Sequence, residues 1–223
     1  MSGTTNTWRG TPLPRGRHKL DAETVESSQR ERLLRAMLEC VDQLGYQATT
    51  VAQVASAARV SPNAFYKFFD DKLECFLALC DEEARGLLDA ALEGIDAPTW
   101  RESLRRGVEG YLRWWQERPE FSRAYLLELP SAGAPAVEQR IRASRPFADM
   151  FAGLAFRARV EQPGVAEPPT LAPDLLMVGV TELVAREVRE GRAGRITDIA
   201  PDVEAVIAAL LAPGAGDPPL HAD

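Results

Sequence analysis

Three polar side chains, Asn63, Tyr66 and Lys67, share one face of a short stretch with helical spacing. An amide can pair with the edge of a DNA base, and a phenol or an ammonium group can contact phosphate oxygens. At about 100° per residue the opposite face is apolar, with Ala64, Phe65, Phe68 and Phe69. The stretch therefore has the chemistry to read DNA, although an ordinary amphipathic helix with a hydrated polar side would show the same pattern.

Two capped helices in tandem are expected to position these side chains. Thr50 is a good N-cap and Gln53 follows three residues later, which is the pattern of a capping box. Ser61 is a second N-cap, and Pro62 takes the first helical position, where a missing N–H costs nothing. Two short helices joined by a turn of about three residues favour a helix-turn-helix motif. A longer helix from about Ser27 to Leu44 would pack beneath it.

The segment Gly45–Lys72 contains a characteristic run of residues. It consists of Gly45-Tyr46, Thr49-Thr50-Val51, Val54-Ala55, Ala58, Val60-Ser61, Phe65-Tyr66, Phe69 and Asp71-Lys72. This run resembles the DNA-binding domain of the tetracycline-repressor (TetR) family. Asn63 stands where Gly is usual and Ala64 where Thr or Ser is usual, so a hydroxyl that could contact DNA is absent. The resemblance implies an all-α fold, with a three-helix helix-turn-helix domain before a helical ligand-binding and dimerisation domain.

Charge is distributed unevenly along the 223 residues. The net charge of −7 argues against general affinity for nucleic acid, but residues 1–72 carry a small excess of Lys and Arg, and the acidic excess lies in 73–223. No apolar run approaches a membrane span and the polar N-terminus lacks a signal-peptide core, so we expect a cytoplasmic protein without membrane contact. Cys40, Cys75 and Cys80 form no CxxC pair, so we expect reduced core thiols.

Apolar spacing predicts helices along the rest of the chain and no convincing strand. They are expected at about Asp71–Ile95, Thr99–Arg118, Glu120–Leu129, Ala136–Arg157, Asp174–Gly191 and Asp198–Leu211. The expected organisation is a disordered basic arm (1–20), the helix-turn-helix domain (21–72), a helical regulatory and dimerisation domain (73–212) and a disordered tail (213–223). In the arm, Arg15 and Arg17 would reach DNA phosphate or the minor groove, although a solubilising tail has the same composition.

The segment Leu175–Val180 is apolar on every side, so its helix must be buried on more than one side. We therefore expect the last two helices to form a four-helix bundle with the same pair of a second subunit. The residues expected at this homodimer interface are Leu176, Val180, Leu183, Val203, Ile207 and Leu210.

Aromatic residues gather in the middle of the chain, where a stripe at helical spacing is usually core. Trp114 and Trp115 are adjacent, however, and cannot share one helix face. With Tyr111 and Tyr125 they supply polar tips on apolar bodies, which suits a ligand cavity, and the TetR resemblance implies such a cavity in the second domain. Its expected lining is Cys80, Tyr111, Trp114, Trp115, Phe121, Tyr125, Met150 and Phe151.

Enzyme chemistry is poorly supported, and we expect no cofactor and no metal. The two histidines, His18 and His221, fall in the expected arm and tail, which argues against His-based triads and metal clusters. The run Asp70-Asp71-Lys72-Leu73-Glu74 is similar to the magnesium-binding motif of prenyl-diphosphate enzymes. Such a site needs a second acidic cluster on a facing helix, and helix capping by Asp70 or Asp71 explains the run more simply.

The sequence thus predicts a homodimeric regulator that binds a pseudo-palindromic double-stranded DNA operator. The simplest interpretation is a repressor released by a small apolar or aromatic effector, whose identity the sequence does not reveal. The expected DNA contacts are Thr50, Ser61, Pro62, Asn63, Ala64, Tyr66, Lys67 and Lys72, and for Lys72 the resemblance implies a phosphate contact. Two alternatives are a TetR-like regulator without a small inducer, acting through protein contacts or as an activator, and a helical enzyme of the prenyl-diphosphate type.

Overall fold

The computed structural model describes residues 22–214, and these residues form helices, turns and loops without a strand. The expected all-α fold is therefore confirmed over this range. The arm, with Arg15 and Arg17, and nearly all of the tail lie outside the described residues. None of the described helices is both long and apolar enough to cross a membrane.

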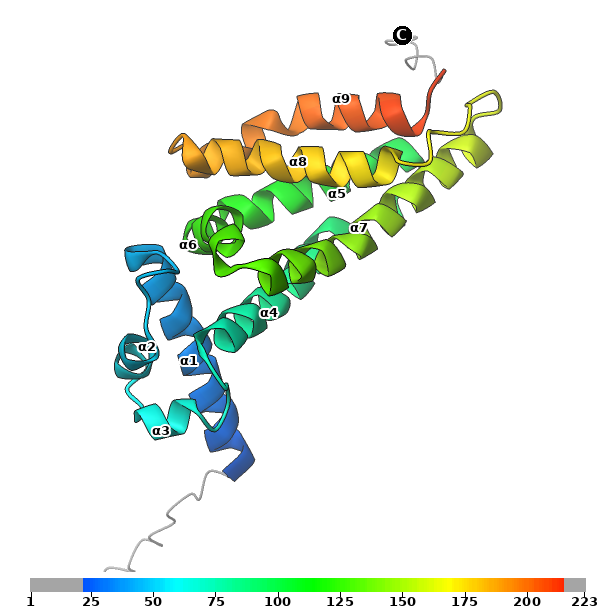
Figure 1. Cartoon of the computed structure of the whole chain (residues 1–223). Helices are drawn as coiled ribbons and strands as arrows, with labels where there is room; N and C mark the ends of the chain where they lie inside the picture. Colours follow the sequence, from blue (N-terminus) through cyan, green and yellow to red (C-terminus); the bar gives the residue numbers. More distant parts are fainter. Residues whose placement is uncertain (1–21, 215–223) are drawn as a thin grey trace, which may run out of the picture.

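Three helices form the N-terminal domain at one end of the molecule: α1 (Ala22–Leu44), α2 (Val51–Ala57) and α3 (Pro62–Phe65). Figure 1 shows α2 and α3 together on one side of α1. Their apolar faces meet in a common core, in which Leu33, Met37, Val54 and Phe65 are fully buried. This burial stabilises two helices that would be too short to persist alone.

The helix α4 (Lys72–Leu92) leads from this domain into the second one, as Figure 1 shows. The second domain packs α4 with α5 (Trp100–Gln116), α7 (Ala134–Glu161), α8 (Ala172–Arg189) and α9 (Ala200–Leu211). Short elements connect them: α6 (Pro119–Arg123), the π-helical turn η1 (Ala124–Glu128), and the 3-10 helices η2 (Leu129–Ala132) and η3 (Ala193–Ile199).

Two glycines let α4 and α5 approach closely. A Cβ at Gly110 would lie 2.1 Å from the carbonyl oxygen of Ala90, and one at Gly107 would lie 3.0 Å from that of Ala91. Real Cβ atoms essentially never approach within 3.0 Å, so the position of α4 against α5 requires glycine at position 110.

Several element boundaries differ from the sequence-based expectation. The helix α8 begins at Ala172, because Pro173 fits the first turn, and Asp174 therefore lies within that turn and is not the N-cap. The helix α7 is longer than the expected Ala136–Arg157 at both ends, and it passes through Pro146 as expected, with Phe147 and Phe151 buried. The expected helix over 120–129 is α-helical only to Arg123, and most of the segment 193–199 is a 3-10 helix ahead of α9. Tertiary packing outweighs local preference at these points.

Candidate DNA-binding surface and effector cavity

The helix-turn-helix has the predicted caps. The backbone N–H of Gln53 donates to Thr50 Oγ1 at 3.3 Å, and the N–H of Thr50 donates back to Gln53 Oε1 at 2.8 Å, which completes the capping box. Ser61 Oγ accepts from the N–H of Ala64 at 3.2 Å. Both caps satisfy backbone donors at helix starts, so the local sequence is enough to define where the two helices begin.

The outward face of α3 and the turn after it is polar and accessible. Asn63 and Lys67 are exposed, and Tyr66 exposes 56% of its surface, while Phe65 and Phe69 anchor the segment in the core. Thr50, Ser61 and Pro62 are also exposed, and Ala64 is half-buried. The structure therefore brings these predicted DNA contacts onto one end of the molecule, where their binding to DNA stays a prediction.

Sequence reasoning missed Arg59, which lies in the turn between α2 and α3. Its φ of 55° places it in the left-handed region, and it is the one non-glycine residue there among residues 22–214. This conformation costs an L-residue roughly 1–2 kcal/mol. Arg59 is exposed and belongs to none of the ion pairs in the described part of the chain. Its guanidinium therefore adds a positive charge beside α3.

Lys72 does not have the free ammonium group that a phosphate clamp needs. Its Nζ donates to the carbonyl oxygens of Tyr46 at 2.9 Å, Gln47 at 3.2 Å and Thr49 at 2.9 Å. It also lies 4.4 Å from the centre of the Tyr46 ring. An ammonium group has three donors, and here all three are used by the loop between α1 and α2. These contacts indicate that Lys72 holds this loop, and its expected phosphate contact stays a prediction.

The second domain holds the same loop from the other side. Glu128, at the end of η1, accepts a hydrogen bond from the N–H of Tyr46 at 2.9 Å. Gly45 has a φ of +78°, which favours glycine, and a Cβ there would lie 3.1 Å from Glu128 Oε2, so this carboxylate would have to shift slightly. Nearby, the guanidinium of Arg123 makes two hydrogen bonds to Asp42, at 2.6 and 3.0 Å. The two domains are thus joined by charge-assisted contacts as well as by α4.

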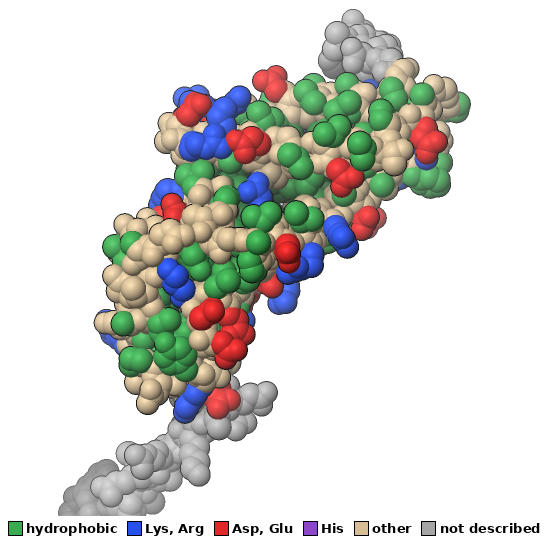
Figure 2. Space-filling view, in the orientation of Figure 1, with side chains coloured by type: hydrophobic (Ala, Val, Ile, Leu, Met, Phe, Trp, Pro, Cys, Tyr) green, Lys and Arg blue, Asp and Glu red, His purple; other side chains and the backbone are tan. Residues whose placement is uncertain are grey.

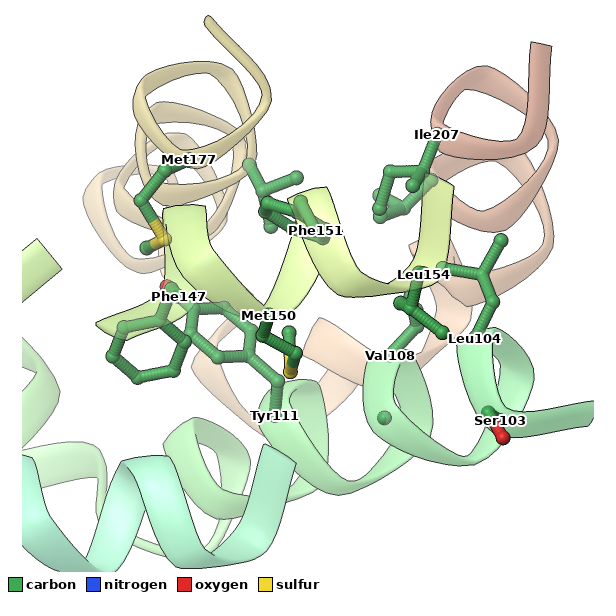
Figure 3. A pocket seen from close by; sticks show the side chains of 13 residues that line it. Ser103, Leu104, Val108, Tyr111, Phe147, Met150, Phe151, Leu154, Met177 and Ile207 are labelled. Carbon is green, nitrogen blue, oxygen red and sulfur yellow. The ribbon is translucent and has the colours of Figure 1, made fainter. Parts of the chain in front are cut away.

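A narrow cavity lies within the second domain between α5, α7, α8 and α9, and its accessible volume is about 20 Å³. Figure 3 shows Tyr111, Phe147 and Met177 toward one end and Ser103, Leu104 and Ile207 toward the other. Its full lining is Ser103, Leu104, Gly107, Val108, Tyr111, Phe147, Met150, Phe151, Leu154, Met177, Val180, Val203 and Ile207. The apolar lining suits an apolar ligand with very few polar groups, and any ligand larger than a water molecule would have to displace side chains of the wall.

Polar groups in the cavity wall are few and already bonded. Ser103 Oγ donates to the carbonyl of Ile95 at 2.7 Å and accepts from Arg157 at 2.8 Å. The hydroxyl of Tyr111 lies 3.3 Å from Thr181 Oγ1, which donates to the carbonyl of Met177 at 2.7 Å. Burial raises the pKa of Tyr111, so its hydroxyl stays protonated at neutral pH.

Of the residues predicted to bind a ligand, Tyr111, Met150 and Phe151 line this cavity. The others, Cys80, Trp114, Trp115, Phe121 and Tyr125, do not line it, and their contact with a ligand stays a prediction. Trp115 stacks on Phe121 with ring centres 5.9 Å apart, and Trp114 meets Phe121 edge-on at 5.6 Å. They form a packed aromatic core beside the cavity. Burial also raises the pKa of the Cys80 thiol, which keeps it protonated.

The residues predicted at the dimer interface, Leu176, Val180, Leu183, Val203, Ile207 and Leu210, all line a groove between α8 and α9, and their place at an interface stays a prediction. Leu176, Val180, Val203 and Ile207 are buried within the protomer, and the last three line the cavity. Leu183 is partly buried, and Leu210 is 40% exposed. The apolar side chains that face outward from α8 and α9 are Leu175, Val178 and Val206, together with Leu210. Figure 2 shows hydrophobic side chains gathered over this α8–α9 face.

Comparison with known proteins identifies the N-terminal domain. Residues 33–79 match the family described as bacterial regulatory proteins, tetR family. The transcriptional activator FasR of Mycolicibacterium smegmatis is 30% identical over 104 residues, which are 46% of this chain and 48% of FasR. The match thus spans about half the length of this curated relative.

Solved structures of transcriptional regulators share the fold of the whole described chain. The fatty acid degradation regulator FadR of Bacillus halodurans has a TM-score of 0.70 at 18% identity, covering 84% of this chain and 99% of FadR. FadR of Bacillus subtilis, solved in complex with stearoyl-CoA, has a TM-score of 0.69 at 16% identity, covering 79% and 96%. PfmR of Thermus thermophilus has a TM-score of 0.64 at 24% identity, covering 84% and 98%.

Proposed function

We propose that this chain, which belongs to the TetR family of bacterial transcriptional regulators, represses transcription as a homodimer and leaves its operator when a small apolar molecule enters the cavity. The observation that carries this proposal is the combination of an accessible helix-turn-helix at one end with an apolar cavity at the other. Contacts that could transmit a change join the two.

A continuous set of contacts leads from the cavity to the DNA-binding domain. Tyr111 in the cavity wall lies 6.2 Å from the ring of Trp115, which lies 5.6 Å from that of Tyr125. Tyr125 belongs to the π-helical turn η1, which ends at Glu128. Glu128 in turn bonds the backbone of Tyr46 beside the helix-turn-helix. A ligand that moves Tyr111 would therefore shift the loop before α2, and π-helical turns are frequent at functional sites.

The coupling free energy needed between the cavity and the DNA-binding domain is modest. An effector can release DNA only if it binds the DNA-incompetent state more tightly, and couplings between sites are typically about 1–3 kcal/mol. Two recognition helices in a dimer must lie one turn of DNA apart, roughly 34–36 Å, so a small displacement of the two domains would weaken binding. The contacts of α4 with α1 and α5 provide a second route, because the helix belongs to both domains.

The outward α8–α9 face supports the homodimer. Leu175, Val178, Val206 and Leu210 expose apolar surface that a second copy of the same face would bury, giving a four-helix bundle.

The solved FadR structure in complex with stearoyl-CoA supports a long apolar ligand, as does the apolar lining of the cavity. Residues 22–72 and 73–212 would then be the DNA-binding and the regulatory units, and the family's regulatory role makes the cytoplasm its expected location.

An activator is the second candidate, because FasR is a transcriptional activator. An enzyme of the prenyl-diphosphate type has less support. Asp71 caps α4 by accepting from the N–H of Glu74 at 2.8 Å, so helix capping accounts for this part of the acidic run.

The test is DNA binding followed by transcription in a purified system. The protein should select a duplex with two related half-sites from the DNA upstream of its own gene. Asn63→Ala should relax the base preference at one position in each half-site, by roughly 1–3 kcal/mol. Transcription from the bound promoter should fall when protein is added and recover when an effector is added. A rise on adding protein would favour the activator, and the absence of any specific duplex binding would refute the proposal.

A further inference from the structure

A groove between α7 and α8 lies beside the cavity. It is apolar except for Arg140, Ser144 and Thr181, and no carboxylate lines it. The remaining lining residues are Leu129, Pro130, Val137, Ile141, Met177 and Val178. The groove therefore combines an apolar surface with a single positive charge.

Arg140 has an unusual environment for a guanidinium group. It is half-buried, and it belongs to none of the ion pairs or side-chain hydrogen bonds found within residues 22–214. Burial raises the pKa of both Tyr111 and Tyr125, and the charge of Arg140 acts on each in the opposite direction. The charge of Arg140 therefore acts on Tyr111 in the wall of the cavity. A partly desolvated guanidinium without an acidic neighbour favours binding of an anion, because its planar donors match a carboxylate.

One side chain, Met177, lines both the groove and the cavity. Its backbone carbonyl accepts the hydrogen bond of Thr181, whose hydroxyl lies 3.3 Å from that of Tyr111. Figure 3 shows Met177 beside Phe147 and Tyr111 at the same end of the cavity. Methionine is unbranched and adapts its conformation readily. A slender apolar chain could therefore extend from the groove toward the cavity if Met177 moves and the cavity wall adapts around it.

We propose that the effector is an amphipathic anion, with its acidic head group on Arg140 in the groove and its apolar tail extending past Met177 into the cavity. The proposal rests on the proposed function, since it takes the cavity to be the effector site. It adds the charge of the effector, the residue that recognises it and the path by which it enters.

The test measures binding by the full-length protein without DNA. Dodecanoate and dodecan-1-ol are titrated by calorimetry, since they share an apolar chain and differ in the charge of the head group. Dodecanoate should bind more tightly than the alcohol. Arg140→Gln should weaken dodecanoate binding about tenfold or more, because a charge-assisted pair is lost, and should leave the alcohol unaffected. Arg140→Lys should recover part of the affinity.

Arg142→Gln is the matched control, because Arg142 is exposed on the same helix and does not line the groove. Thermal melting of all variants shows whether they fold alike. Equal binding of the two probes, an unchanged dodecanoate affinity in Arg140→Gln, or no binding of either probe would each overturn the inference. Release of operator DNA is measured separately. Dodecanoate bound through Arg140 without DNA release would support this site and refute effector-driven release.

Discussion

The role of Lys72 can be separated from that of Lys67 by matched substitutions. Both residues are lysines at the helix-turn-helix end of the chain, but Lys67 is exposed whereas Lys72 donates to three backbone carbonyls. We consider Lys67→Met and Lys72→Met, because methionine keeps an unbranched apolar stem and removes the charge.

For Lys72→Met we expect a loss of stability. Hydrogen bonds that involve a charged group contribute about 1.5–3 kcal/mol each to stability. Because three that share one ammonium are not additive, we expect the free energy of unfolding to fall by roughly 2–4 kcal/mol. For a chain of this size that corresponds to a melting temperature roughly 5–15 °C lower. Water can replace part of the loss, because Gln47 is exposed. Operator affinity should fall as the loop loosens, but its dependence on salt should not change.

For Lys67→Met we expect unchanged stability and a weaker dependence of operator affinity on salt. The melting temperature should stay the same, because Lys67 belongs to none of the ion pairs and side-chain hydrogen bonds found within residues 22–214. If Lys67 neutralises one phosphate, the slope of log affinity against log salt should fall by about one unit.

The assay combines thermal unfolding with operator binding by fluorescence anisotropy at several salt concentrations. A Lys72→Met variant with an unchanged melting temperature and a salt slope about one unit lower would refute this reasoning. It would mean that the ammonium leaves the carbonyls and contacts phosphate in the DNA complex.

Three further predictions follow from packing and charge. Gly110→Ala should lower the melting temperature sharply because its Cβ would overlap the α4 backbone, whereas Gly153→Ala, in open space within α7, should raise it slightly; equal effects would contradict the close packing. Glu187, buried and bonded to Arg192 at 2.6 Å, has a lowered pKa, so its stabilising effect is present above pH 4.5 and declines below it. The stability difference between Glu187→Gln and wild type should accordingly shrink from pH 7 to pH 3. Val206→Glu should yield monomers in sedimentation while Val160→Glu, equally exposed on α7, should not.

Local chemistry made the helix-turn-helix predictable. The capping hydrogen bonds at the N-termini of α2 and α3 join residues only three apart, Thr50 with Gln53 and Ser61 with Ala64. Local sequence is therefore enough to predict them. The alternation of Phe65 and Phe69 with Asn63 and Lys67 likewise indicated which face would be buried. The sequence by itself therefore determined the fold class and which side chains of α3 are exposed.

The tertiary structure decided the sites that depend on distant neighbours. A helix that is apolar on every side, such as Leu175–Val180, does not show from sequence which residues face the protomer's own core. The positions of α5, α7 and α9 bury Leu176 and leave Leu175 exposed. From the sequence, Lys72 is expected to be a surface cation. In the fold, its ammonium group contacts backbone carbonyls of residues that lie 23 to 26 positions earlier in the chain. Arg140 and Met177 become one site only because α7 packs on α8. Hydrophobic burial favours any well-packed partner, so the choice of partner is a property of the whole chain.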